Sequence, residues 1–182
     1  MTYLSPAKIN LFLHITSKRD DGYHNLQTIF QLLDFYDEID FSLRDDGKIN
    51  RISGNEDILI SNDLMIKSAK KLKQYRRANC GVDIKILKKI PKGGGLGGGS
   101  SNAATTLIAL NKLWNLKLTN AELISIGKDI GADVPVFIEG RSSWAEGIGE
   151  ILTPLNLPEY FYLVVSINKQ ISTREIFSHK AL

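Results

Sequence analysis

The chain has 182 residues, which is enough for one well-buried globular domain and short for two. Its hydrophobic content of 43% and its net charge of +3 permit an anionic ligand, but they do not indicate a nucleic-acid partner or a membrane surface. A single cysteine, Cys80, excludes an internal disulfide, and no secretory, transit or membrane-spanning segment is visible, so we expect a cytoplasmic protein.

The N-terminal part of the chain has the two-residue period of β-strands. Lys8–Ile15 alternates apolar and polar residues, which predicts a strand with one face in a core. The expected core face holds Ile9, Leu11, Leu13 and Ile15. A turn is indicated at Asp20-Asp21-Gly22, and Leu26–Leu33 and Glu38–Leu43 predict two further strands.

A helix is expected next, over Leu64–Ala78, with Asn62 as a favourable N-cap. Its apolar residues recur at helical spacing, while its outer face is rich in lysine and arginine. Tyr75 is the one aromatic residue among these charges, so the repeated aromatic interleaving that single-stranded nucleic acids require is absent, which favours a solvated helix face.

Strand and helix then alternate through the middle of the chain. Val82–Ile90 has a strand period and is ended by Pro91, and after a glycine run Asn102–Trp114 has a helical period. The segment Thr119–Glu122 forms a capping box, which predicts a helix to about Ile130.

The C-terminal third predicts a loop that leads into a buried apolar stretch over Gly131–Ile138. Glu150–Leu152 and Phe161–Ile167 are expected to be strands, and Thr173–His179 the first turns of a helix. Antiparallel-type hairpins mixed with helices indicate an α+β fold.

The glycine run between Pro91 and Asn102 carries most of the functional information. Its members are Gly93, Gly94, Gly95, Leu96, Gly97, Gly98 and Gly99, followed by Ser100 and Ser101. The run joins a strand directly to an apolar-faced helix, which argues against a flexible linker. Glycines allow positive φ and close approach of backbone amides to an oxyanion, and the helix start adds unpaired amides and a positive dipole end. We therefore expect a nucleotide-phosphate cradle, although neither the Walker pattern nor the dinucleotide fingerprint is present.

Four motifs make the chain resemble the GHMP kinases, a family of small-molecule kinases. They are Pro91–Ala104, Ser5–Leu11, Arg19–His24 and Gly131–Phe137. The resemblance implies a GHMP-kinase N-terminal domain over 1–160, with a mixed, mostly antiparallel sheet (ribosomal protein S5 domain 2-like) packed with helices. It also implies that 161–182 begins a second domain that is cut short, so we expect an ATP cradle with weak or absent catalysis. Apolar surface that should pack on the missing domain would be exposed and could drive self-association, and we expect a monomer or a weak homodimer.

The activity that the resemblance implies is ATP-dependent phosphorylation of a hydroxyl, with ATP and Mg²⁺ as cofactors. The motifs are most similar to the branch of the family that acts on the 2-hydroxyl of 4-diphosphocytidyl-2-C-methyl-D-erythritol in non-mevalonate isoprenoid synthesis. The expected partner is then a cytidine diphosphate sugar-alcohol. The alternatives are another GHMP kinase, or a non-catalytic nucleic-acid-binding module that uses the basic helix.

Two residues are candidates for the chemical step. From sequence alone, Asp133 is equally compatible with a general base and with a turn cap. A lysine such as Lys8 on a strand is usually solvated. The resemblance implies that Asp133 is the base and Lys8 its partner, with Asn10 on the same strand face close to both.

The remaining candidates are binding residues. By resemblance, the hairpin residues Tyr23 and His24 hold cytidine, and Thr173 and Phe177 add substrate contacts; an incidental surface hairpin is the alternative. Asn62 resembles a contact to adenosine, and Lys88 either lies near the nucleotide or is a solvated strand lysine. Ser100 and Ser101 are hydroxyls that can reach phosphate or lie near Mg²⁺.

Overall fold

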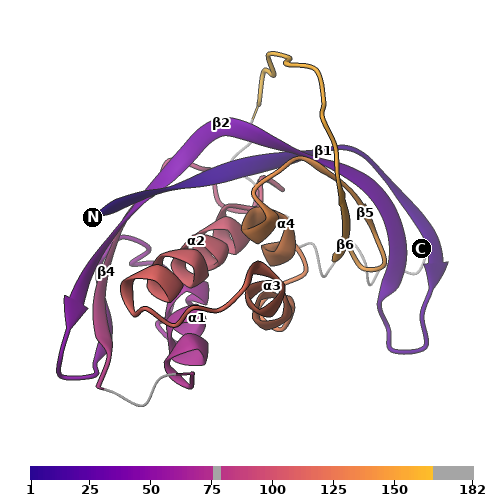
Figure 1. Ribbon diagram of the computed structural model, residues 1–182. Helices are drawn as coiled ribbons and strands as arrows, with labels where there is room; N and C mark the ends of the chain where they lie inside the picture. The colour runs from indigo at the N-terminus through magenta and orange to yellow at the C-terminus, as the bar shows by residue number, and fades with distance from the viewer. Residues whose placement is uncertain (76–78, 166–182) are drawn as a thin grey trace.

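The computed structural model describes residues 1–75 and 79–165, and within them a six-stranded mixed sheet arches over four helices (Figure 1). The central strand is β2, which pairs antiparallel with β1 along one side and with β4 and β5 along the other. On the outside, β3 runs parallel to β4, and β6 runs antiparallel to β5. The strands are β1 (Thr2–Lys18), β2 (His24–Arg44), β3 (Ile49–Ser53), β4 (Gly81–Leu87), β5 (Ser143–Glu146) and β6 (Ile151–Pro154).

The helices fill the concave side of this arch (Figure 1). They are α1 (Leu64–Lys73), α2 (Gly98–Leu113), α3 (Asn120–Lys128) and α4 (Val134–Glu139). The core forms where α2 packs on the sheet, and Leu107 and Leu110 are fully buried there together with Ile39 and Ile84. The α+β expectation is confirmed. Among the described residues, no helix is long and apolar enough to cross a membrane.

The expected core face of β1 is wrong. Leu11 and Leu13 are 42% and 41% exposed, whereas Lys8 is only 5% exposed. The register of β1 on β2 shifts between Pro6 and Lys8 and again between Asn10 and Leu13. Such irregularities turn a strand about its axis, so a strict two-residue period assigned the wrong face to the interior.

Three strand assignments also differ from expectation. Leu26–Leu33 and Glu38–Leu43 are parts of one continuous strand, β2. The strands β3 and β5 were not expected from sequence, because both are short and carry mixed polar and apolar residues. No strand forms over 161–165, and residues 166 and 167 lie outside the described residues, as does the expected helix at Thr173–His179.

The observed helix boundaries differ from the expected ones at α1 and α2. The N-cap of α1 is Asp63, not Asn62, because the Asp63 carboxylate accepts from the Met65 N–H at 2.9 Å. The helix ends at Lys73, before the expected Ala78. At its start, α2 includes Gly98, four residues earlier than the sequence period predicted.

The capping box of α3 is confirmed: the Thr119 hydroxyl accepts from the Glu122 N–H, and the Glu122 carboxylate accepts from the Thr119 N–H at 2.8 Å. We predict that Thr119→Ala lowers the free energy of unfolding by about 0.5–2 kcal/mol, measured by urea denaturation. Ser125→Ala, at an exposed position inside the same helix, is the control and should change it by less than about 0.5 kcal/mol. Equal effects of the two variants would contradict the capping role.

Candidate functional site

A cavity of about 1540 Å³ lies between the glycine loop, β1 and the start of α4. The tip of the β1–β2 hairpin, the loop after β3 and the loop before α4 also contribute to its wall. Four of the motifs singled out in the sequence therefore meet in one place. The predicted site residues that line it are Lys8, Asn10, Tyr23, His24, Lys88, Pro91, Gly93–Gly99, Ser100 and Asp133.

The glycine loop has a backbone that side-chain-bearing residues rarely adopt. Gly93, Gly95 and Gly97 have φ values of +70°, +72° and +70°. At Gly97 the constraint is also spatial, because a Cβ would lie 2.7 Å from the Phe137 ring and 3.1 Å from Lys8 Cε. The loop therefore needs glycine at this point both for its torsion angle and for its path.

The N-terminus of α2 opens onto the cavity. The helix begins at Gly98 after Gly97 in the left-handed conformation, with no side-chain cap, and its Ser101 N–H donates to the Gly97 carbonyl at 2.8 Å. The amides of Gly98, Gly99 and Ser100 have no acceptor within the helix, and all three residues line the cavity. A helix start of this kind attracts an anion through its amides and its dipole.

The loop is held against β1. The Lys8 N–H donates to the Leu96 carbonyl at 3.0 Å, and the Leu96 side chain packs with Ala7 and Ile90 in a small apolar cluster. The only non-glycine residue in the run thus anchors the loop, and the amides on either side of it are fixed relative to Lys8.

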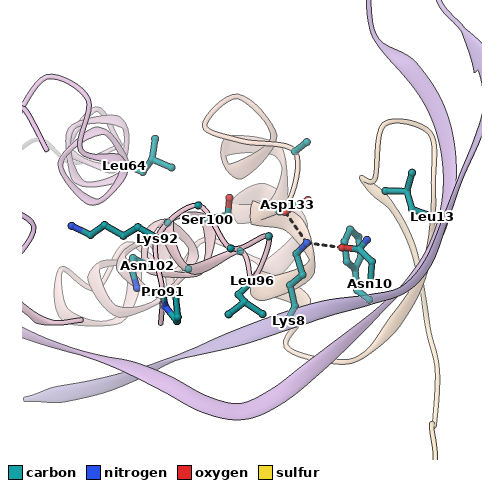
Figure 2. Close-up of a pocket in the computed structure, with 18 of the residues that line it drawn as sticks. Lys8, Asn10, Leu13, Leu64, Pro91, Lys92, Leu96, Ser100, Asn102 and Asp133 are labelled. Carbon is teal, nitrogen blue, oxygen red and sulfur yellow. Dashed lines mark hydrogen bonds and ion pairs between the residues drawn. The ribbon is translucent and has the colours of Figure 1, made fainter. Parts of the chain in front are cut away.

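The Lys8 side chain joins the candidate chemical groups (Figure 2). Its Nζ lies 3.3 Å from Asp133 Oδ2 and donates to Asn10 Oδ1 at 2.7 Å. The ammonium also lies 5.3 Å from the centre of the Phe30 ring, and Asn10 Nδ2 donates to Thr28 Oγ1 at 2.8 Å. Because Lys8 is almost fully buried, its position is fixed by these partners rather than by solvent.

The Asp133 carboxylate remains available for chemistry. Asp133 occupies the N-cap position of α4, yet its side chain makes no capping hydrogen bond, so the turn-cap interpretation is wrong. About a third of the side chain is exposed, on the cavity side, next to a buried cation. A carboxylate that is exposed to a cavity can accept a proton from a bound hydroxyl.

The hairpin tip places two rings at the other end of the cavity. Tyr23 is 58% exposed, while His24, the first residue of β2, is buried. The tip is fixed by hydrogen bonds from Arg19 N–H to the Tyr23 carbonyl and from Tyr23 N–H to Asp21. The Arg19 guanidinium, and then the Tyr23 N–H, lower the pKa of Asp21, so this turn keeps its ionic contact at neutral pH.

The other predicted binding residues have different surroundings. The Lys88 ammonium is bound to Asp37 and Asn102 rather than solvated. The Ser101 hydroxyl is fully buried, accepts from Ser5 and does not line the cavity. Asn62 is exposed and also outside the cavity wall.

Two predicted residues, Thr173 and Phe177, lie outside the described part of the chain. Conversely, sequence reasoning missed the ion pair between Lys92 and Asp57, which joins the glycine loop to the loop after β3 at the cavity wall. The Lys92 ammonium lowers the pKa of Asp57. The only sequence signal for this contact is that Lys92 immediately precedes the glycines.

Comparison with known proteins gives one family match: the domain described as "GHMP kinases N terminal domain" matches residues 63–141. A 4-diphosphocytidyl-2-C-methyl-D-erythritol kinase of Ruthia magnifica subsp. Calyptogena magnifica is 63% identical over 181 residues. These residues cover 100% of this chain and 64% of that protein. The chain thus spans slightly less than two thirds of the length of this relative.

Two solved structures are also similar to this chain. A crystal structure of 4-(cytidine 5'-diphospho)-2C-methyl-D-erythritol kinase superposes with a TM-score of 0.73 at 38% identity, covering 87% of this chain and 56% of that chain. The mevalonate kinase of Methanococcus jannaschii has a TM-score of 0.61 at 16% identity, covering 86% of this chain and 56% of that chain, and so shares the fold.

The close approach at Gly97 can be tested by substitution. We predict that Gly97→Ala lowers the free energy of unfolding by about 2–5 kcal/mol, because a left-handed torsion and an overpacked contact both oppose the new methyl group. Gly94→Ala is the matched control, since a Cβ there would meet nothing closer than 3.8 Å. Urea denaturation measures both, and a loss at Gly94 as large as at Gly97 would refute the steric argument.

Proposed function

We propose that this chain belongs to the GHMP kinase family and is the ATP-binding and catalytic part of a kinase that phosphorylates the 2-hydroxyl of 4-diphosphocytidyl-2-C-methyl-D-erythritol. The observation that carries the proposal is the Lys8–Asp133 pair, which faces the same cavity as the glycine loop and the start of α2. The products are ADP and the 2-phosphate ester of the substrate.

The proposed chemistry uses Asp133 as the general base. Its carboxylate accepts the proton of the 2-hydroxyl as the hydroxyl oxygen attacks the γ-phosphorus of ATP. The Lys8 ammonium lies beside Asp133, where it orients the carboxylate and stabilises negative charge on the attacking oxygen. Asn10 accepts from Lys8 and so holds the ammonium in place.

The residues around the glycine loop fit a triphosphate. The path of Gly97 leaves no room for a side chain, which brings backbone amides close to the cavity. The amides of Gly98, Gly99 and Ser100 bind the phosphate oxygens, with the α2 dipole as a further attraction. The ammonium groups of Lys88 and Lys92, at the same wall, add positive charge.

The proposal includes Mg²⁺ bound largely through ATP. Among the described residues, no group of three or more His, Cys, Asp or Glu side chains could hold a metal ion. This fits a Mg²⁺ held mainly by phosphates and water, with one or two protein oxygens such as the Ser100 hydroxyl. When bound, the ion neutralises charge that develops on the phosphates.

The proposed acceptor site is the hairpin end of the cavity. Tyr23 is exposed there and can stack on a cytosine ring, and the neighbouring His24 can bond its polar edge. The relatives' names describe kinases of a cytidine diphosphate compound, which supports this assignment of the acceptor. We further propose a cytoplasmic location, in keeping with the reduced, buried Cys80. Weak catalysis by the 182-residue chain stays a prediction.

The chemical roles predict a loss of rate without a loss of binding. Asp133→Asn should lower the rate of ADP formation by about 10²–10⁴-fold, because the base is removed. Lys8→Met should also lower it strongly. The ATP dissociation constant should change by less than about threefold in both variants, because neither group is proposed to bind ATP in the ground state.

The controls for this test are Asp129→Asn and Lys71→Met, since these residues form an exposed ion pair outside the cavity. Both should keep the original rate. If Asp133→Asn retained full turnover, Asp133 would not be the base.

The stacking role of Tyr23 predicts a selective effect on the acceptor. Tyr23→Ala should weaken binding of cytidine diphosphate by about 5–150-fold, the equivalent of about 1–3 kcal/mol of stacking. Tyr23→Phe keeps the ring and should bind within about threefold of the original chain. Isothermal titration measures both, with ATP as the reference ligand. Unchanged cytidine diphosphate binding by Tyr23→Ala would favour another acceptor and hence another GHMP kinase activity.

A further inference from the structure

Along one edge, the central strand β2 pairs with two different strands, β5 near its start and β4 near its end. Strand β4 pairs with it up to Leu87, opposite Glu38, and β5 begins pairing only at Phe30. After Leu87 the chain leaves the sheet and enters the glycine loop. Asp37, the residue that precedes Glu38 in β2, lies where β4 ends its pairing with β2.

One oxygen of Asp37 holds the entry to the loop. Its Oδ1 accepts from the backbone N–H groups of Lys89 at 2.7 Å and Ile90 at 2.9 Å. These hydrogen bonds take the place of strand pairing where β4 separates from β2. They fix the two residues immediately before Pro91, and thus the direction in which the loop starts.

The other oxygen of Asp37 holds the exit from the loop. Its Oδ2 accepts from Asn102 Nδ2 at 2.9 Å and from the Lys88 ammonium. Asn102 lies in the first turns of α2, and its Nδ2 also donates to Ser5 Oγ at 2.9 Å. One carboxylate therefore joins both ends of the glycine loop and one lysine of the cavity wall.

Stability alone does not account for a charge at this position. The Asp37 side chain is fully buried and that of Lys88 is 16% exposed. Removing two charges from water costs several kcal/mol for each ion, and an apolar pair of similar volume is often as stable. What an apolar pair cannot do is accept four hydrogen bonds from the two ends of one loop.

We propose that Asp37 is a positioning residue for nucleotide binding, acting through the glycine loop and Lys88; this inference rests on the proposed kinase function. Asp37 does not line the cavity itself, whereas Lys88, Pro91 and Asn102 do. It holds the loop amides in the arrangement that binds a triphosphate and keeps the Lys88 ammonium next to Gly98, where an added Cβ would lie 3.1 Å from Nζ. Preorganised donors bind an anion without the cost of ordering.

The test is Asp37→Asn, which preserves shape. The new amide oxygen can still accept from Lys89 and Ile90, but its NH₂ group would face two other donors, on Lys88 and Asn102. We expect the dissociation constant for a non-hydrolysable ATP analogue to rise about tenfold or more. The new NH₂ group cannot accept hydrogen bonds from Lys88 and Asn102, so these bonds are lost and the glycine loop becomes less ordered. Binding of cytidine diphosphate should change less than about twofold, since the hairpin end is untouched.

The matched control is Asp83→Asn. Asp83 also lies in the sheet and accepts from Arg44 at 2.8 Å and Asn50 at 2.9 Å, but outside the cavity. It should leave both affinities unchanged. A purely structural role for Asp37 would weaken both ligands together, in step with a lower melting temperature, and that result would overturn the inference, as would an unchanged ATP affinity.

A second variant covers the case in which Asp37→Asn does not fold. Asn102→Ala cuts the link between Asp37 and α2 while the buried Asp37 charge keeps its ion pair with Lys88, and it should also weaken binding of the ATP analogue selectively. If Asn102→Ala binds the analogue as well as the original chain does, the positioning role is refuted. Failure of the original chain to bind any ATP analogue refutes the proposed function itself, and the inference with it.

Discussion

The site depends on one close approach: the glycine loop passes between β1 and α4 at Gly97, where no side chain fits. On one side lies the Phe137 ring and on the other the stem of Lys8. Because the backbone itself occupies this gap, the first turn of α2 starts right beside the Lys8–Asp133 pair. A wider separation would leave the unpaired amides at the start of α2 and the Asp133 carboxylate in different parts of the cavity.

Charge in the cavity is balanced before any ligand binds. Each lysine among the described lining residues has a carboxylate partner: Lys8 pairs with Asp133, Lys88 with Asp37 and Lys92 with Asp57. These pairs range from largely buried to partly exposed, so they differ in what they do. The two buried lysines are fixed in place, whereas Lys92 and Asp57 at the rim are partly exposed and are more readily separated by an incoming anion.

Sequence patterns singled out many residues that line the cavity, but not the residues that support its wall. Glycines at Gly93–Gly99 indicated a phosphate loop because their torsion angles and lack of side chains are properties of the residues themselves. Asp37 gave no signal, since an aspartate between two predicted strands is typical of a turn. Its importance comes from Lys88 and Asn102, which lie more than fifty residues away along the chain and reach it only through the fold.

The sequence by itself determined the α+β class and the α3 capping box, and it singled out the glycine run and the candidate residues Lys8, Tyr23 and Asp133. Each of these depends on local spacing or on a motif, which a linear pattern preserves. Only the tertiary structure decided that β1 turns Lys8 inward and leaves Leu11 exposed, because register shifts against β2 set that face. It also decided that the Asp133 carboxylate points to Lys8 instead of capping α4, since the choice between those partners depends on contacts from a distant strand.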